Sequence, residues 1–355
     1  MEQPQPAPAK KRGLRLAVQG SLALLVSVIA LWWAFHGVDV EEMRENLKRS
    51  SVWVVLAFLV GQLLIHGFRI VRWGMLIQHM EPKVSNRAVF AAANLGISAT
   101  FFVPLRLGEL IRPMLISRSG VPFGSAVASI VVERIADGLC SVGLFFIFFS
   151  YLPADTLADG NMAELVGDLT KASRLAAFVF VGGLFFLVAA ALARGPVLGL
   201  TKTILSKISV TLAERIVGLI TTFLDGLAAL GSAWRALLYV GLTIAYWVGN
   251  GLLTWMLAVS YEPSLPVVSG LFTISVLVFL VMIPAGPAFA GTFEAGFKLG
   301  FGAFGLDQAT VIVIAVVAHV AQLLMMGILV GAGFMSLEAK QRHQSEDEAP
   351  PPAPA

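Results

Sequence analysis

Charged residues are scarce in this chain. Asp, Glu, Lys and Arg make up 13% of the 355 residues and apolar residues make up 57%, whereas soluble domains contain roughly 25% and 45–50% of these classes. The balance excludes an ordinary soluble globular protein and predicts an integral membrane protein. We expect an all-α polytopic fold, because runs of apolar residues dominate the sequence.

Cysteine and familiar catalytic motifs are also nearly absent. Cys140 is the only cysteine, so the chain cannot form an internal disulfide, and no Cys/His spacing suits a metal site. The sequence has no D-x-D, Walker-type phosphate loop, G-x-S-x-G or H-E-x-x-H motif. We therefore expect no metal, no cofactor and no nucleic-acid partner, and no enzyme activity that depends on these motifs.

Long apolar runs are what the sequence does contain. About 20 apolar residues cross a ~30 Å hydrocarbon core, and six runs reach that length: 14–36, 52–78, 125–150, 174–194, 234–260 and 307–335. Two further apolar regions, 86–117 and 266–304, are interrupted by Pro and Gly. Irregular backbone at membrane depth needs protein or water to satisfy its polar groups. The sequence thus predicts six spanning helices and two re-entrant hairpins of broken helices.

The remaining segments define the limits of the transmembrane domain and its orientation in the membrane. Residues 1–13 and the acidic, Pro-rich 339–355 are expected to be disordered tails around one transmembrane domain, 14–338. The segments 196–230 and 39–50 are expected to be amphipathic stretches on the membrane surface. Most of the 25 basic residues fall on one side if the N-terminus is cytoplasmic. We expect both termini on the cytoplasmic side of a bacterial inner membrane.

The topology predicts that the two hairpins open to opposite sides of the membrane, as in inverted repeats. The two units would be about 52–150 and 234–335. Glu109 is followed after 11 residues by Gly120, and Glu294 after 11 residues by Gly305. Continuing in step, Arg134 aligns with His319, and Asp137 with Gln322.

Four segments in this order resemble a known family. They are FRIVRW (68–73), Asn94 followed by PLRLGELIRP (104–113), SIVVERIADGL (129–139) and PAGPAFAGTFE (284–294). Together they are similar to the transmembrane region of lysylphosphatidylglycerol synthases, a flippase-like family, over about 14–335. The late loop departs from the family's PGGIGxxE by Pro287 and Phe289. The resemblance implies movement of aminoacylated phosphatidylglycerol between leaflets; the soluble domain that attaches the amino acid is expected to be absent.

The stretch PLRLGELIRP places charges between two apolar regions. An ionised side chain at the bilayer centre costs at least ~2.5–3.5 kcal/mol, so it faces protein or water and is a functional candidate. Pro104 and Gly108 predict that a helix begins near Gly108, with Glu109 in its first turn. Arg106, Glu109 and Arg112 either neutralise one another and fix the hairpin, or leave an arginine free to bind a lipid phosphate.

Other charges near the hairpins extend this candidate site. Arg134 lies near the middle of its span and needs a carboxylate, which Asp137 or Glu109 could supply; Arg69 and Arg72 are either interfacial anchors or headgroup ligands. Glu294 precedes Lys298 by four residues, a spacing that permits an ion pair, and His319 is either a satisfied core histidine or a proton carrier. The candidate headgroup-binding residues are Arg69, Arg72, Asn94, Arg106, Glu109, Arg112, Glu133, Arg134, Asp137 and Glu294. The candidate hinges are Pro104, Gly108, Pro284, Gly286 and Gly291.

The function expected from these features is translocation of an anionic or polar-headed lipid. Arg106, Arg112 and Arg134 would meet the phosphate, and Glu109, Asp137 and Glu294 would hold those arginines or receive a cationic headgroup. The partner would be a membrane phospholipid or a lipid-linked substrate, and the apolar faces leave a homo-oligomer open. The alternatives are a membrane glycosyltransferase, in which a carboxylate acts as base, and a scaffold for envelope enzymes.

Overall fold

The computed structural model describes residues 21, 24–103, 108–153, 160–207, 209–227, 232–283 and 286–347. These residues form helices and no β-strand, which confirms the all-α class. After a first helix, Leu24–Phe35, the elements are α2 (Val40–Lys48), α3 (Val52–Met80), α4 (Asn86–Phe102), α5 (Ile111–Ser117), α6 (Phe123–Phe149), α8 (Gly160–Leu192), α9 (Arg194–Ser206), α10 (Val210–Leu227), α11 (Ala233–Val259), α12 (Val267–Met282), the 3-10 turn η3 (Pro287–Phe289), α13 (Thr292–Gly302) and α14 (Gln308–Asp347).

Several helices are suited to crossing a bilayer. Four are long and apolar enough: Val52–Met80, Val166–Ala190, Ala233–Val259 and Gln308–Leu337. The pair Leu24–Phe35 and Val40–Lys48, bent by 84°, would make a fifth as a broken span. With 27 residues α6 also has the length, but it carries Glu133, Arg134 and Asp137. The multi-pass architecture is confirmed, with four or five spans by length and composition among the described residues, where we expected six.

Some predicted boundaries differ from the structure. The apolar helix expected at 174–194 begins earlier, because α8 starts at Gly160 and its candidate span at Val166. The last helix, α14, continues to Asp347 and so enters the segment expected to be a disordered tail. Residues 1–13, the expected N-terminal tail, lie outside the described part of the chain.

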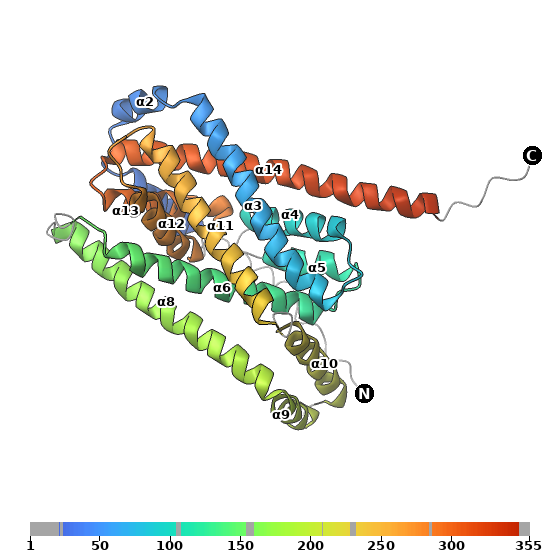
Figure 1. The fold of residues 1–355 in the computed structure, drawn as a ribbon. Helices are drawn as coiled ribbons and strands as arrows, with labels where there is room; N and C mark the ends of the chain where they lie inside the picture. The colour runs from blue at the N-terminus through green and yellow to red at the C-terminus, as the bar shows by residue number, and fades with distance from the viewer. Residues whose placement is uncertain are drawn as a thin grey trace, which may run out of the picture.

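The segment 196–230 forms two helices, α9 and α10, rather than one surface stretch (Figure 1). Of these, α10 packs along α6. The hydroxyl of Ser125 on α6 donates to the carbonyl of Thr222 at 2.6 Å, and Gly226 lets the two helices approach, since a Cβ there would lie 2.8 Å from the Cβ of Ala128. This helix is therefore held against the helix that carries the central charges.

Both Pro/Gly-interrupted regions form two helices that pack against each other. In the first region, a Cβ on Gly96 of α4 would lie 2.8 Å from the Cα of Arg112 in α5, and one on Gly108 would lie 2.3 Å from the backbone of Ala99. In the second region, α12 and α13 pack closely, with Gly300 against Thr273. Small residues permit these close approaches. That the two hairpins are re-entrant stays a prediction.

The two expected repeat units have the same order of elements. A long helix (α3 or α11) is followed by a hairpin (α4 and α5, or α12 and α13) and then by another long helix (α6 or α14). Contacts between the units follow the same correspondence: α4 packs on α14, α12 packs on α6, and α3 packs on α11 (Figure 1). Each hairpin thus lies against the last helix of the other unit, and the space enclosed between the units is bounded by both.

The apolar core also joins the units. One buried cluster combines Phe58 of α3 with residues of α11 to α14, including Phe297 and Ile314. A second combines Trp73 of α3 with α4, α5 and Met325 of α14. Because each cluster draws on both units, the helices around the enclosed space are fixed relative to one another.

Candidate functional site

The centre of the charged site is Glu133 on α6, whose side chain is fully buried. Its Oε1 accepts from Arg69 Nε at 3.0 Å and from Arg134 Nη2 at 2.7 Å, while its Oε2 accepts from Arg112 Nη1 at 2.7 Å. Arg72 Nη2 lies 3.7 Å from the same carboxylate. One buried carboxylate therefore collects four arginines from α3, α5 and α6. The sequence did not identify Glu133 as the partner of Arg134.

Asp137, one turn further along α6, holds the other side of the cluster. It accepts from Arg72 Nη1 at 2.6 Å and from the indole Nε1 of Trp247 at 3.1 Å. Arg72 also donates to Thr243 Oγ1 at 2.9 Å and lies over the ring of Tyr239. The side chain of Arg72 is 0% exposed. Of the two roles considered for it from the sequence, the interfacial anchor is therefore excluded.

Arg112 is likewise part of the buried framework. Its guanidinium lies 4.9 Å from the ring centroid of Trp73 and its side chain is 2% exposed. It does not line the cavity described next, and the expectation that it meets a phosphate stays a prediction. Arg112 also bonds Glu133, a residue outside the Arg106–Glu109–Arg112 set that one of the two interpretations paired internally. Pro104 and Arg106 lie outside the described residues.

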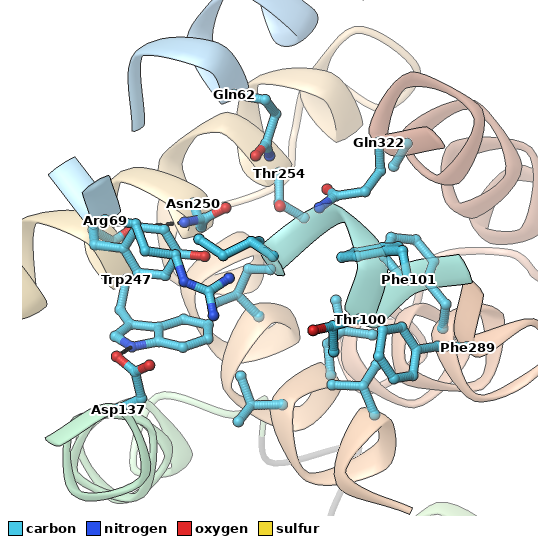
Figure 2. A pocket seen from close by; sticks show the side chains of 18 of the residues that line it. Gln62, Arg69, Thr100, Phe101, Asp137, Trp247, Asn250, Thr254, Phe289 and Gln322 are labelled. Atoms are coloured by element: carbon cyan, nitrogen blue, oxygen red, sulfur yellow. Dashed lines mark hydrogen bonds between the residues drawn. The ribbon is translucent and has the colours of Figure 1, made fainter. Parts of the chain in front are cut away.

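A cavity of about 160 Å³ lies between the two units, and four charged side chains line it: Arg69, Glu109, Arg134 and Asp137. Figure 2 shows Arg69, Trp247 and Asp137 on one side of it and Thr100, Phe101 and Phe289 on the other. Arg134 Nη1 lies 3.9 Å from Glu109 and Nη2 lies 3.5 Å from Asp137. These longer separations leave Arg134 less tightly held at the cavity than at Glu133.

The guanidinium of Arg69 is only partly used by the protein. Within the described residues its hydrogen bonding is limited to Nε, which donates to Glu133, and its side chain is 16% exposed at the cavity. The two terminal nitrogens are therefore available to a ligand. Counting Arg69, Arg72, Arg112 and Arg134 against Glu109, Glu133 and Asp137, the cluster carries one surplus positive charge.

Uncharged polar side chains complete the cavity wall, and of these only Gln322 was singled out from the sequence, as the counterpart of Asp137. They come from α3, α11 and α14: Gln62, Asn250, Thr254 and Gln322. Figure 2 shows Gln62, Thr254 and Gln322 pointing toward one another. Amide side chains inside otherwise apolar spans were the available signal, since polar groups within a bilayer face the protein interior.

Glu294 belongs to a separate cluster in the second unit. Its Oε2 accepts from the backbone N–H of Gly291 at 2.7 Å, and its Oε1 lies 2.6 Å from His319 Nδ1. Lys298 instead contacts the carbonyl of Trp33 at 2.8 Å, so the expected Glu294–Lys298 pair does not form. The structure thus keeps Glu294 apart from the cavity-lining charges.

His319 fixes the tip of the second hairpin. Its Nε2 lies 2.9 Å from the carbonyl of Ala288, and Ala288 and Phe289 both have positive φ, 59° and 58°. Such backbone is costly for residues other than glycine and persists where its surroundings hold it. The result places Phe289 edge-on against Phe101 of the first hairpin, with centroids 5.2 Å apart.

The remaining candidates lie around this framework. Asn94 is fully buried and contacts His66 Nε2 at 3.1 Å, away from the cavity. Gly286 donates its N–H to Ser27 Oγ at 2.8 Å, and Gly291 adopts φ +87° where a Cβ would lie 2.5 Å from the carbonyl of Ser27. Both glycines pack on the first helix. Pro284 lies outside the described residues.

No three His, Cys, Asp or Glu side chains of the described residues gather as metal ligands would. What the arrangement offers instead is a buried charge network with arginine donors at a cavity. Breaking one partner of such a network costs ~3–5 kcal/mol, because it leaves an uncompensated buried charge. The network can therefore hold Arg69 and Arg134 ready for an anion.

Comparison with known proteins agrees with this architecture. The model of the family described as "Lysylphosphatidylglycerol synthase TM region" matches residues 20–331. A protein from Haloferax volcanii named "Glycosyltransferase AglD" is 24% identical over 327 residues, which cover 86% of this chain and 52% of that protein. The chain thus spans about half the length of that relative. These matches indicate a membrane protein of lipid or glycan metabolism. The chain belongs to the lysylphosphatidylglycerol synthase transmembrane-region family.

Proposed function

We propose that this protein moves a lipid with an anionic headgroup between the two leaflets of the membrane, with the headgroup passing through the cavity between the units. The observation that carries the proposal is the placement of Arg69 and Arg134. Both line the cavity while a fully buried carboxylate, Glu133, orients them. An arginine fork with spare donors suits a phosphate oxygen.

The charge balance favours an anion over a cation at this place. The cluster has one surplus positive charge, and a phosphate would satisfy it. Arg134 is 3.9 Å from Glu109 and 3.5 Å from Asp137, so it can turn from these carboxylates to the phosphate while its 2.7 Å bond to Glu133 persists. Glu109 and Asp137 then act as positioning residues, which release and recapture the arginine.

Transfer between leaflets requires the cavity to open in turn to each side. The contact of Phe101 with Phe289 joins the tips of the two hairpins beside the cavity. Separation of these rings, with Gly108, Gly286 and Gly291 at the ends of the broken helices, is the movement that the proposal requires. Units related by inverted repeats commonly rock in this way around a site near the midplane.

The test is translocation in proteoliposomes containing the full chain. A membrane-impermeant reductant quenches fluorescent phosphatidylglycerol in the outer leaflet only. A fluorescence loss greater than the outer-leaflet share therefore reports lipid that has moved from the inner leaflet. We expect transport by the natural protein and loss in Arg69→Gln and Arg134→Gln. Arg194→Gln is the matched control, because Arg194 pairs with Asp225 and both are about half exposed.

The proposal fails if folded, monodisperse protein moves neither phosphatidylglycerol nor another anionic lipid, or if the two cavity variants transport as fast as the control. A second function has one specific observation in its favour, the relative named glycosyltransferase. In that case Glu109 or Asp137 would act as base on a lipid-linked acceptor. Release of product from a labelled sugar donor by the purified chain, without any lipid movement, would favour this alternative.

We also propose the membrane in which the protein resides and the side on which its termini lie. The protein would reside in a bacterial inner membrane with both termini in the cytoplasm, where the excess of Lys and Arg beside the spans would lie. Accessibility of single cysteines introduced near either end, in a Cys140→Ser background, to an impermeant maleimide on intact cells would test this orientation. Labelling of either terminus before lysis would contradict it.

A further inference from the structure

The neutral polar wall of the cavity distinguishes between classes of headgroup. Gln62 is 6% exposed and Thr254 is 1% exposed, and they lie near Gln322 on one wall (Figure 2). Within the described residues, none of these three side chains has a hydrogen bond to another protein group. Buried amides and hydroxyls without partners are costly, so these groups are satisfied by what enters the cavity.

Each of these groups can both donate and accept, as a hydroxyl can. The amides of Gln62 and Gln322 present a carbonyl and an NH₂, and Thr254 presents a hydroxyl. Asn250 adds an acceptor, because its Nδ2 donates to the carbonyl of Tyr246 at 2.7 Å and its Oδ1 is left for the cavity. A ligand with several hydroxyls matches such a wall, whereas an ammonium group, which only donates, would satisfy the carbonyls alone.

The carboxylates at the cavity do not provide an amine site. Asp137 is already bonded by Arg72 at 2.6 Å and by Trp247 at 3.1 Å, and Glu109 faces Arg134. An amine would have to displace an arginine from its carboxylate inside a low-dielectric interior. The site therefore disfavours a cationic headgroup.

Aromatic side chains lie beside the polar groups of the cavity. The indole of Trp247 is fixed by its bond to Asp137, and in Figure 2 it lies between Asp137 and Asn250. Tyr246 lines the same side. Pockets that bind organic ligands combine such apolar faces with a few placed polar groups, and a sugar ring presents both apolar C–H faces and hydroxyls.

We infer that the headgroup for this cavity is a sugar joined to the lipid through a phosphate. The phosphate would lie on Arg69 and Arg134, and the sugar hydroxyls on Gln62, Thr254, Gln322 and the carbonyl of Asn250. This inference rests on the proposed function and specifies its substrate class. The side chains assigned to the sugar differ from the arginines assigned to the phosphate, so each set can be substituted on its own.

The experiment compares three fluorescent lipids in proteoliposomes of the full chain: a hexosyl polyprenyl phosphate, the same polyprenyl phosphate without sugar, and phosphatidylethanolamine. We expect the hexosyl lipid to move about tenfold faster than the bare phosphate lipid, as the loss of one or two hydrogen bonds implies. Phosphatidylethanolamine, whose amine finds no open carboxylate, is expected to move slowest.

Two variants remove the neutral polar groups with little change in shape. The double variant Gln62→Leu with Gln322→Leu, and separately the near-isosteric Thr254→Val, should slow the hexosyl lipid toward the rate of the bare phosphate lipid. Both should slow the bare lipid much less than the hexosyl lipid. Arg69→Gln should slow both lipids, because it acts on the phosphate they share.

The outcomes separate the two proposals. Equal rates for the hexosyl and bare lipids in the natural protein, or variants that slow both equally, would mean that the neutral wall binds only water, and the sugar inference would be overturned while translocation stands. Faster movement of phosphatidylethanolamine would overturn it in favour of an amine headgroup. If no lipid moves, the proposed function itself falls and the inference falls with it.

Discussion

The imidazole Nδ1 of His319 lies 2.6 Å from Oε1 of Glu294, and the aligned residues of the first unit, Arg134 and Glu109, also face each other, at 3.9 Å. In both units a carboxylate of the hairpin meets a basic side chain of the following long helix, 25 residues later. The two units thus have equivalent pairs of side chains with different roles. Glu109 and Arg134 line the cavity, whereas His319, paired with Glu294, fixes the tip of the second hairpin.

Removing the His319 side chain should loosen the second hairpin. In His319→Ala the carbonyl of Ala288 and the carboxylate of Glu294 lose their partner, so the strained backbone at Ala288 and Phe289 is no longer held. We expect faster amide hydrogen exchange in 286–291 and no change in 86–102. The exposed His79→Ala is the control, and equal exchange in both variants would show that His319 does not hold the tip.

Neutralising Glu133 should cost far more stability than neutralising Glu109. Glu133→Gln leaves several buried arginines without their shared carboxylate, and we expect a loss of ~3–5 kcal/mol. Glu109 is 24% exposed and its ion pair with Arg134 is 3.9 Å long, so Glu109→Gln should cost clearly less than Glu133→Gln. Thermal unfolding in detergent measures both, and similar melting temperatures would contradict a central role of Glu133.

A methyl group at Gly96 should separate the arms of the first hairpin. The Cβ of Gly96→Ala would lie 2.6 Å from the Cβ and 2.8 Å from the Cα of Arg112, so α5 must shift and carry Arg112 away from Glu133. We expect a lower melting temperature. Gly143→Ala, with nothing within 4 Å of the added Cβ, is the matched control and should gain ~0.5–1 kcal/mol; a loss of stability in Gly143→Ala equal to that in Gly96→Ala would refute the steric argument.

Linking the hairpin tips should stop transport. Phe101 and Phe289 contact each other beside the cavity, and the proposed movement requires them to separate. In a Cys140→Ser background, Phe101→Cys with Phe289→Cys joined by a short bismaleimide should lose translocation, and either single cysteine treated alike should keep it. Transport at full rate through cross-linked protein would mean that the tips need not part.

The sequence by itself determined the class of protein and the broken regions. Long apolar runs with few charges exclude a soluble globular protein, which follows from composition alone. Pro and Gly within 86–117 and 266–304 prevent continuous helices there, which follows from local backbone chemistry. The repeated spacing of Glu109 and Glu294 also predicted that the units correspond. Their shared element order and reciprocal contacts agree with that correspondence.

Only the tertiary structure decided which charges meet. Glu133, rather than Asp137 or Glu109, became the centre because α3, α5 and α6 converge on it from distant parts of the chain. Arg112 turned inward under Trp73, while Arg69 kept donors at the cavity. Gln62, Thr254 and Gln322 come together from three helices. Spacing along one helix fixes its faces but not the rotation and approach of its neighbours, and packing between helices sets these.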